Sequence, residues 1–420
     1  MFIRSYLIAL LRIDVHVNLT PKNLIMLMQK VKRPSIPPEW YRPSLLGTIT
    51  FIVYAVILCA VPGFLCRVVA TSFDSLPLRI MLMVPLTILT AYGFQLLGFV
   101  GHEGLHISLH RNKMVSVLLG LFFASSVVTY FEMGFAVHHW NHHRFTNQAS
   151  DPDIQPVKHL KAWWQRILFS RPIYNFLYFK TALNIALGDT WPFPYKMPFT
   201  ALPGVMRYIS SGQDARTTRV SWFNFVPHKS GNRCKLSTVR ILCWTNFAFA
   251  LFWFSFYVGI ALYDPLTGLF SIALPLIVTM LINACQTYID HAGTSDELFR
   301  NAWSRTSPLM TALYFGSNYH LEHHLYPGIP CYRLHKIHKL LKERGIYEQV
   351  NAPIEPSFFG SYRKVAADYI AGTDNSFDPF QPAIDWRKQK VWGRVQKFLF
   401  RRGFKPVQNG VTKFKIWWGY

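Results

Sequence analysis

The stretch ILCWTNFAFALFWFSFYVGIALYDPLTGLFSIALPLIVTMLINACQTYIDHAGT, residues 241–294, decides the fold of this chain. It contains two runs without Lys, Arg, Asp, Glu or His, at 241–263 and 267–289, separated by little more than Asp264 and Pro265. A helix needs roughly 20 apolar residues to cross the hydrocarbon core of a membrane. Each run is long enough, so we expect the two runs to form a helical hairpin in the membrane.

Two further runs of the same kind precede this stretch, at about 45–66 and 80–101. The segment RVVATSFDSLPLR, residues 67–79, joins them and predicts a second hairpin. The composition agrees, because 51% hydrophobic and 15% charged residues is unusual for a water-soluble chain of 420 residues. The sequence therefore predicts an all-α integral membrane protein with four transmembrane helices arranged as two hairpins.

The distribution of basic residues predicts the orientation. Of the 44 Lys and Arg residues, only Arg67 and Arg79 lie in the expected outer turns of the hairpins. By the positive-inside rule, the opposite face, which carries both termini, is cytoplasmic. The net charge of +23 accompanies apolar spans and aromatic residues and no nucleic-acid motif. We therefore expect contact with anionic lipid head groups and no nucleic-acid partner.

Three regions follow from this reading. Residues 1–44 form a basic entry segment, residues 45–345 a catalytic domain, and residues 346–420 a basic cytoplasmic tail. For its part 387–405 we expect contact with lipid head groups, with docking of an acidic electron carrier or a simply solvated tail as the alternatives. The apolar run 114–131 is long enough to be ambiguous, but the histidines described next meet on one side only if it does not cross. The six cysteines form no CxxC pair and predict neither a disulfide framework nor a thiolate metal site.

Nine of the 16 histidines fall in three tight clusters. These are His102 and His106 in HEGLH, His138, His139, His142 and His143 in HHWNHHR, and His320, His323 and His324 in HLEHH. Residues four apart share a helix face, whereas adjacent residues diverge by about 100°. His110 would continue the face of the first cluster. Adjacent histidines are thus suited to serve two neighbouring ions.

The number of histidines predicts two metal ions. One ion needs only three or four imidazoles, and His291, just after the fourth span, should emerge on the same side as His102 and join them. Asp151 and Asp153 in ASDPDIQP, and Asp290, are candidates to accept the free ring N–H of a ligand, although an ordinary Asp-Pro turn explains the first two equally well. For His110 and His138 we expect supporting or surface roles rather than ligation.

One competing interpretation comes from HEGLH itself. It matches HExxH, in which two histidines bind Zn²⁺ and a glutamate, here Glu103, acts as general base of a metalloprotease. A membrane zinc protease would need only one more ligand and would leave the other two clusters unexplained. A pair of ions uses all three clusters.

Across residues 45–345 the chain resembles the membrane fatty acid desaturase superfamily, since HEGLH is similar to its HxxxH box and HHWNHH and NYHLEHHLYPGIP to its HxxHH boxes. The resemblance implies a cytoplasmic helical cap with a di-iron site whose ligands are His102, His106, His139, His142, His143, His320, His323 and His324, with His291 similar to the additional histidine after the fourth span.

The resemblance also implies dioxygen as co-substrate and a lipid or fatty acyl substrate, as in fatty acid biosynthesis. Some relatives carry a fused haem domain with an HPGG motif, and this sequence has none. We therefore expect electrons from a separate ferredoxin or cytochrome type protein. Desaturase, carotenoid or other lipid hydroxylase, and ketolase share these motifs, so the reaction, the regioselectivity, the chain length and the acyl carrier stay open.

Overall fold

The computed structural model describes residues 31–128, 130–147, 163–187 and 236–360, together with Asp151, Asp153 and Leu160. The chain divides into two units, residues 1–36 and 37–420, and the description below concerns the second. Residues 1–30 of the entry segment and the basic segment 387–405 lie outside the described residues. The described part is mostly helical, with four helices apolar and long enough to cross a membrane.

The first two long helices pack closely against each other. α3 (Leu45–Ser72) begins after the N-cap Ser44, whose side chain accepts a hydrogen bond from the Gly47 N–H at 3.3 Å. Residues 73–75 connect it to α4 (Leu76–Leu105). At Gly93 a methyl group would lie 2.3 Å from the backbone nitrogen of Cys59, so the crossing of the two helices requires a residue without a side chain. The short 3-10 helix η1 (Pro38–Tyr41) precedes them.

The second pair is formed by α9 (Leu236–Tyr263) and α11 (Leu274–His291). Between them lie Asp264, α10 (Pro265–Thr267) and the π-helical turn η4 (Gly268–Ala273). Asp264 caps α10 by accepting a hydrogen bond from the Thr267 N–H at 3.3 Å, and it forms an ion pair with Arg67 of α3. The ion pair therefore connects the ends of the two helical pairs.

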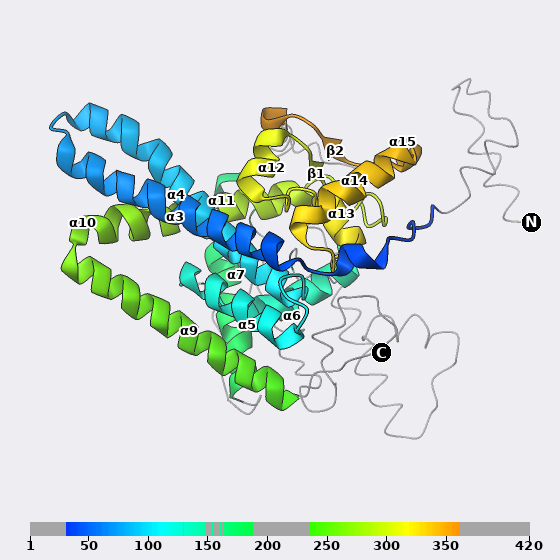
Figure 1. Ribbon diagram of the computed structural model, residues 1–420, viewed down its shortest axis with the longest axis horizontal. Helices are drawn as coiled ribbons and strands as arrows, with labels where there is room; N and C mark the ends of the chain where they lie inside the picture. Colours follow the sequence, from blue (N-terminus) through cyan, green and yellow to red (C-terminus); the bar gives the residue numbers. More distant parts are fainter. Residues whose placement is uncertain are drawn as a thin grey trace, which may run out of the picture. The chain divides into compact units, whose positions relative to one another are not determined.

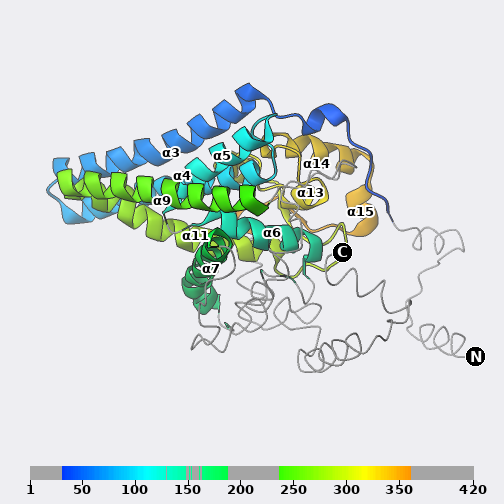
Figure 2. The same cartoon turned by 90° about the horizontal axis from the view of Figure 1, so that it is seen from below.

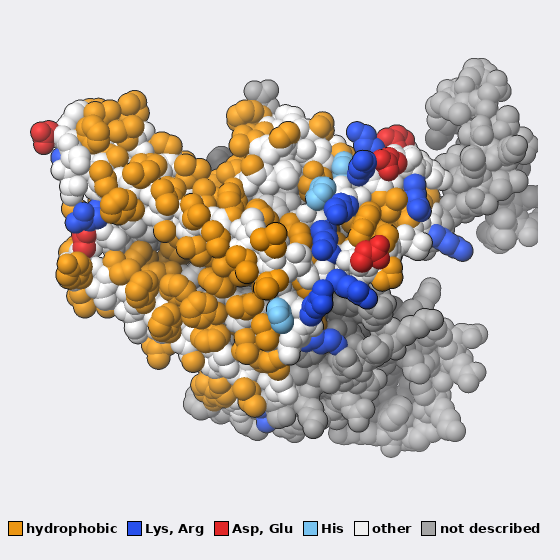
Figure 3. Space-filling view, in the orientation of Figure 1, with side chains coloured by type: hydrophobic (Ala, Val, Ile, Leu, Met, Phe, Trp, Pro, Cys, Tyr) orange, Lys and Arg blue, Asp and Glu red, His pale blue; other side chains and the backbone are white. Residues whose placement is uncertain are grey.

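These helices expose far more large apolar side chains than the surface of a water-soluble protein. Leu262 is 81% exposed and Tyr263 93% exposed, and large apolar side chains lie outward along α3, α4 and α9. Figure 3 shows this apolar surface on one side of the view and a concentration of Lys and Arg at the other end. Exposed apolar surface of this extent indicates contact with lipid, which agrees with the membrane protein predicted from the sequence.

The ambiguous run 114–131 does not form a long helix. α5 (Lys113–Ala124) has 12 residues and is followed by the 3-10 turn η2 (Ser125–Val127). At about 1.5 Å per residue, α5 is far shorter than the roughly 30 Å of a hydrocarbon core. Instead α5 packs on α4, where a methyl group on Gly104 would lie 2.6 Å from the Cα of Gly120.

Two helices then bring the second histidine cluster into the structure. α6 (Glu132–Phe145) packs on α7 (Trp163–Ala186), which also contacts α9 and α11. The α6–α7 crossing is very close at Gly134, where a methyl group would lie only 1.8 Å from the carbonyl oxygen of Tyr178. Figures 1 and 2 show α6 beside α5 and α7, at the end of the long helices.

The segment after α11 is built from short elements. They are β1 (Ser304–Arg305), α12 (Pro308–Tyr314), α13 (His320–Leu325), η5 (Cys331–Arg333), α14 (Leu334–Glu343), α15 (Ile346–Val350) and β2 (Ile354–Glu355). β1 and β2 pair in parallel, with Ser304 opposite Ile354. This strand pair departs from the all-α expectation. It could not be predicted from the sequence, because strands of two residues are too short to show a hydrophobic periodicity. Figure 1 shows α13, α14 and α15 at the end opposite the α3–α4 connection.

Candidate metal centre

The first two histidines lie where α4 ends. His102 is in the last turn of the helix, and His106 is its C-cap, with its N–H donating to the His102 carbonyl at 3.2 Å. Ile107 then takes a positive φ of 59°, which turns the chain away from the helix. The prediction that His110 continues this helix face is therefore wrong, because the helix ends before reaching it.

The two HxxHH segments form helices of different length. α6 carries His139, His142 and His143, and α13 carries His320, His323 and His324. In both helices the adjacent histidines diverge as expected from a turn of about 100° per residue. The ring centroids are 6.0 Å apart for His142 and His143. Each of the two helices therefore directs histidines toward two neighbouring potential metal sites.

The nine histidines predicted as ligands gather in two groups. The first group contains His102, His106, His139, His143 and His323, and the second contains His142, His291, His320 and His324. We call them the five-histidine group and the four-histidine group. In each group the facing ring nitrogens lie within 4.8 Å of one another. The second and third histidine clusters of the sequence contribute to both groups. His102 and His106, the first cluster, both belong to the five-histidine group, and His291 belongs to the four-histidine group.

The spacing within each group fits a metal ion. In the five-histidine group, His139 Nε2 lies 3.1 Å from His106 Nε2 and 2.9 Å from His143 Nε2. In the four-histidine group, His291 Nε2 lies 3.1 Å from His142 Nε2 and 3.0 Å from His320 Nε2. Ligands at right angles on an ion with bonds of about 2.1 Å stand about 3 Å apart. A ring nitrogen carries one hydrogen or one lone pair, so hydrogen bonds alone do not explain this convergence.

The outward nitrogens of several rings have fixed partners. His291 Nδ1 lies 2.9 Å from the Asn301 carbonyl oxygen, and His142 Nδ1 lies 3.0 Å from Asp151 Oδ1. Such contacts hold a ring with its other nitrogen toward the site. Burial lowers the pKa of His142, but the carboxylates of Asp151 and Asp153 outweigh burial and raise this pKa to about 9.

Asp151 is more than a turn residue. It is 1% exposed, and besides facing His142 it accepts hydrogen bonds from the N–H of Asn147 at 2.8 Å and of Asp153 at 2.9 Å. Asp153 Oδ2 lies 3.4 Å from His142 Nδ1. The structure thus brings both predicted aspartates to the second histidine cluster.

The other three supporting candidates lie elsewhere. Asp290 accepts a hydrogen bond from Arg305 at 2.7 Å, with both side chains buried. His138 is buried on α6 with its Nε2 3.4 Å from the Thr181 hydroxyl, and His110 accepts a hydrogen bond from the Asn112 N–H. None of the three belongs to either histidine group in the described part of the chain.

Glu103, the general base of the zinc-protease interpretation, is engaged in structural hydrogen bonds. Its Oε2 accepts from the Ser108 hydroxyl at 2.7 Å and from the Cys331 N–H at 2.9 Å. It is 2% exposed. These contacts connect the end of α4 to the loop after α13, and thereby hold His102 and His106 close to His323.

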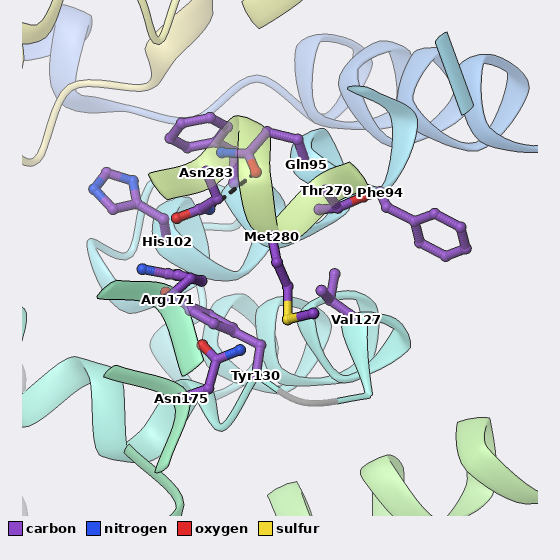
Figure 4. A pocket seen from close by; sticks show the side chains of 12 residues that line it. Phe94, Gln95, His102, Val127, Tyr130, Arg171, Asn175, Thr279, Met280 and Asn283 are labelled. Atoms are coloured by element: carbon purple, nitrogen blue, oxygen red, sulfur yellow. Dashed lines mark hydrogen bonds between the residues drawn. The ribbon is translucent and has the colours of Figure 1, made fainter. Parts of the chain in front are cut away.

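A cavity adjoins the five-histidine group at His102. It lies between α4, α7 and α11 and has about 440 Å³ of empty space, part of it open to the outside. Figure 4 shows Gln95 and Asn283 on one wall, with a hydrogen bond between them, and Tyr130, Arg171 and Asn175 on another. None of these five residues was predicted from the sequence as part of a site. Gln95 and Asn283 carried a usable signal, because polar side chains within membrane spans often mark a functional site.

Comparison with known proteins agrees with this geometry. The model of the fatty acid desaturase family matches residues 78–356, which is more than half of the chain and includes all nine grouped histidines. No curated protein matches the chain. The match and the four apolar helices identify a membrane protein of the oxidoreductase type, with histidine groups that could bind metal. The chain belongs to the fatty acid desaturase family.

Proposed function

We propose that the protein is an oxygen-dependent lipid desaturase that removes two hydrogens from adjacent carbons of a fatty acyl chain. The observation that carries the proposal is the convergence of nine imidazoles in two adjacent groups at one end of four apolar helices. One ion needs only three or four imidazoles, so nine are enough for two ions side by side. A single structural or hydrolytic ion would not use nine ligands.

The five-histidine group and the four-histidine group would each hold one iron ion. Iron suits imidazole ligands and, when bound, would supply the activation of dioxygen. The chain's own residues keep the site in place: Asp151 and Asp153 hold the Nδ1 proton of His142, and the Asn301 carbonyl holds that of His291. The apolar helices around the site keep bulk water away from the reacting carbons.

The overall reaction requires a partner. Forming one C=C bond while reducing dioxygen to two waters consumes two electrons and two protons beyond the two hydrogens taken from the substrate. We propose that a separate ferredoxin or cytochrome type protein supplies the electrons. Exposed Lys336, Lys339 and Lys342 on α14 follow the α13 ligands in the chain and form a basic surface that suits an acidic partner.

We further propose that residues 45–345 are the catalytic domain, with α3–α4 and α9–α11 as two membrane hairpins and the histidine groups in a cytoplasmic cap. The charge distribution supports this arrangement. Arg67 and Asp264 pair at the connection of the helices, whereas most Lys and Arg in Figure 3 lie at the other end. Both termini would then be cytoplasmic, with residues 346–420 as a tail.

The same site would also serve a carotenoid or other lipid hydroxylase or a ketolase, and product analysis separates these reactions. Lipids from cells that express the protein would be analysed by mass spectrometry. We expect a loss of two mass units and a new double bond, whereas a gain of one oxygen would replace the desaturase by a hydroxylase.

Metal analysis tests the two-ion site directly. We expect about two irons per chain in the detergent-purified protein. His143→Ala, in the five-histidine group, and His291→Ala, in the four-histidine group, should each lose at least one iron, whereas His110→Ala should retain both. A single zinc that withstands both ligand substitutions would instead support a protease that uses HEGLH.

A further inference from the structure

The cavity beside His102 has a polar wall that a plain hydrocarbon chain does not explain. Arg171, on α7, lines it, and so do Tyr130 and Asn175. Figure 4 shows the guanidinium end of Arg171 extending toward the side of the cavity on which His102 lies. The cavity thus joins one of the grouped histidines to a cationic side chain.

Arg171 is 6% exposed, yet it has no carboxylate within ion-pair distance among the described residues. Its guanidinium carbon lies 5.1 Å from the ring centroid of Tyr130 and 5.7 Å from that of Tyr178. Aromatic faces stabilise a cation in part. A guanidinium stays protonated in proteins, and a buried charge is normally paired with an anion.

Two acidic residues interact electrostatically with Arg171, namely Glu132 and Asp153, but neither forms an ion pair with it. Glu132 is completely buried, and neither of its carboxyl oxygens has a hydrogen-bond partner in the part of the chain that the structure describes. Burial raises the pKa of Glu132 well above its usual range, although Arg171 lowers it in part. Glu132 therefore forms no ion pair with Arg171, and among the described residues no carboxylate lies within ion-pair distance of this guanidinium.

The opposite wall is polar as well. Asn283 Nδ2 of α11 donates to Gln95 Oε1 of α4 at 2.9 Å, within two predominantly apolar helices. A methylene chain filling the cavity would remove water from these amides and from Arg171 without replacing its hydrogen bonds, which is unfavourable. An oxygen-bearing group would satisfy them.

We propose that this cavity binds an oxygen-bearing end of the lipid substrate, a carboxylate most tightly, with Arg171 as its main contact. The reacting carbons would then lie near the polar end of the substrate rather than far along an unsubstituted chain. The inference rests on the proposed function only in assuming that the histidine groups are the place of reaction. The binding preference itself does not depend on turnover.

Photoaffinity labelling tests the preference. Three probes share one alkyl chain with a diazirine and differ only in their end, which is a carboxylate, a hydroxyl or a methyl group. The iron-loaded full chain in detergent would be labelled with each probe, and labelled peptides mapped by mass spectrometry. We expect the carboxylate probe to label cavity peptides with at least about tenfold higher affinity than the methyl probe, with the hydroxyl probe between them.

Variants on one helix identify the residue responsible. Arg171→Met should reduce the carboxylate-to-methyl ratio to about one, and Arg171→Lys should retain part of it. Arg166→Met removes the same charge from α7 outside the cavity and should leave the ratio unchanged. A ratio near one in the unchanged protein, or an unaltered ratio in Arg171→Met, would overturn the proposal.

Iron content and thermal unfolding are measured on every sample. If Arg171→Met does not fold, the ratio of the unchanged protein and that of Arg171→Lys decide the question. Absence of iron from the unchanged protein would contradict the proposed desaturase but not the cavity preference. Two irons with equal labelling by all three probes would contradict the cavity preference alone.

Discussion

Replacing Gly134 with Ala should disrupt the proposed metal centre. Gly134 belongs to neither histidine group, and the change adds only one methyl group. That methyl would lie 1.8 Å from the Tyr178 carbonyl oxygen, whereas ordinary contact begins at 3.4 Å. The obstacle is backbone, so no side-chain rotation relieves it. α6 and α7 would have to separate by about 1.6 Å at this point.

The magnitude follows from two opposing effects. Ala stabilises a helix by about 1 kcal/mol relative to Gly, while overpacking a close contact costs about 1–3 kcal/mol and more when backbone must move. We expect a net loss of about 2 kcal/mol. The displacement also exceeds the tolerance of about 0.2 Å in metal–ligand distances. Because α6 contributes histidines to both histidine groups, we expect both groups to lose their proposed iron.

The assay is iron content and thermal unfolding of detergent-purified protein, with Gly259→Ala on α9 as control. A methyl group on Gly259 would meet no atom within 4 Å, so this variant should keep its iron and its stability. If Gly134→Ala retained about two irons and unfolded at the same temperature as the control, the close packing of α6 on α7 would be refuted as the element that positions the histidines.

Three further outcomes are expected. Asp151→Asn should weaken retention of the ion in the four-histidine group by about 10–100-fold, measured as iron release to a chelator, and exposed Asp296→Asn should not. Asp290→Asn leaves its buried partner Arg305 without an ion pair and should lower the free energy of unfolding by about 3–5 kcal/mol. Glu297→Gln breaks an exposed ion pair and should lower it by roughly 0.5 kcal/mol. A loss for Asp290→Asn no larger than that of Glu297→Gln, measured by thermal unfolding, would contradict this prediction. Gly98→Leu should project into the cavity and lower kcat/KM at least about tenfold with unchanged iron, and equal turnover would exclude the cavity as the substrate path.

Local signals in the sequence were sufficient for the helices and the histidines. Absence of charge over about 20 residues predicts a membrane span, and the described part of the chain has four helices long and apolar enough to cross a membrane at the predicted places. Helical periodicity likewise predicted that adjacent histidines diverge, and His142 and His143 do so. His291 was predicted from its position at the end of a span, since helices that end on the same side bring their last residues together.

Long-range packing decided what these signals could not. Glu103 belongs to a motif that predicts a catalytic base, yet its partners, Ser108 and Cys331, show its structural contacts only after the chain has folded. His110 follows His106 at the spacing of a ligand, but it belongs to neither histidine group, because α4 ends at Leu105. Spacing describes one helix, whereas the end of a helix depends on what packs against it.

The sequence by itself determined the family, the four apolar helices and the nine histidines, because hydrophobicity and ligand spacing are properties of short segments. The tertiary structure decided how the nine divide into five and four, and which helices enclose the cavity beside His102. Only the tertiary structure showed that Arg171 lines this cavity. A lone arginine in a sequence does not reveal that it will be buried with no carboxylate partner among the residues that the structure describes, since burial and pairing depend on residues distant in the chain.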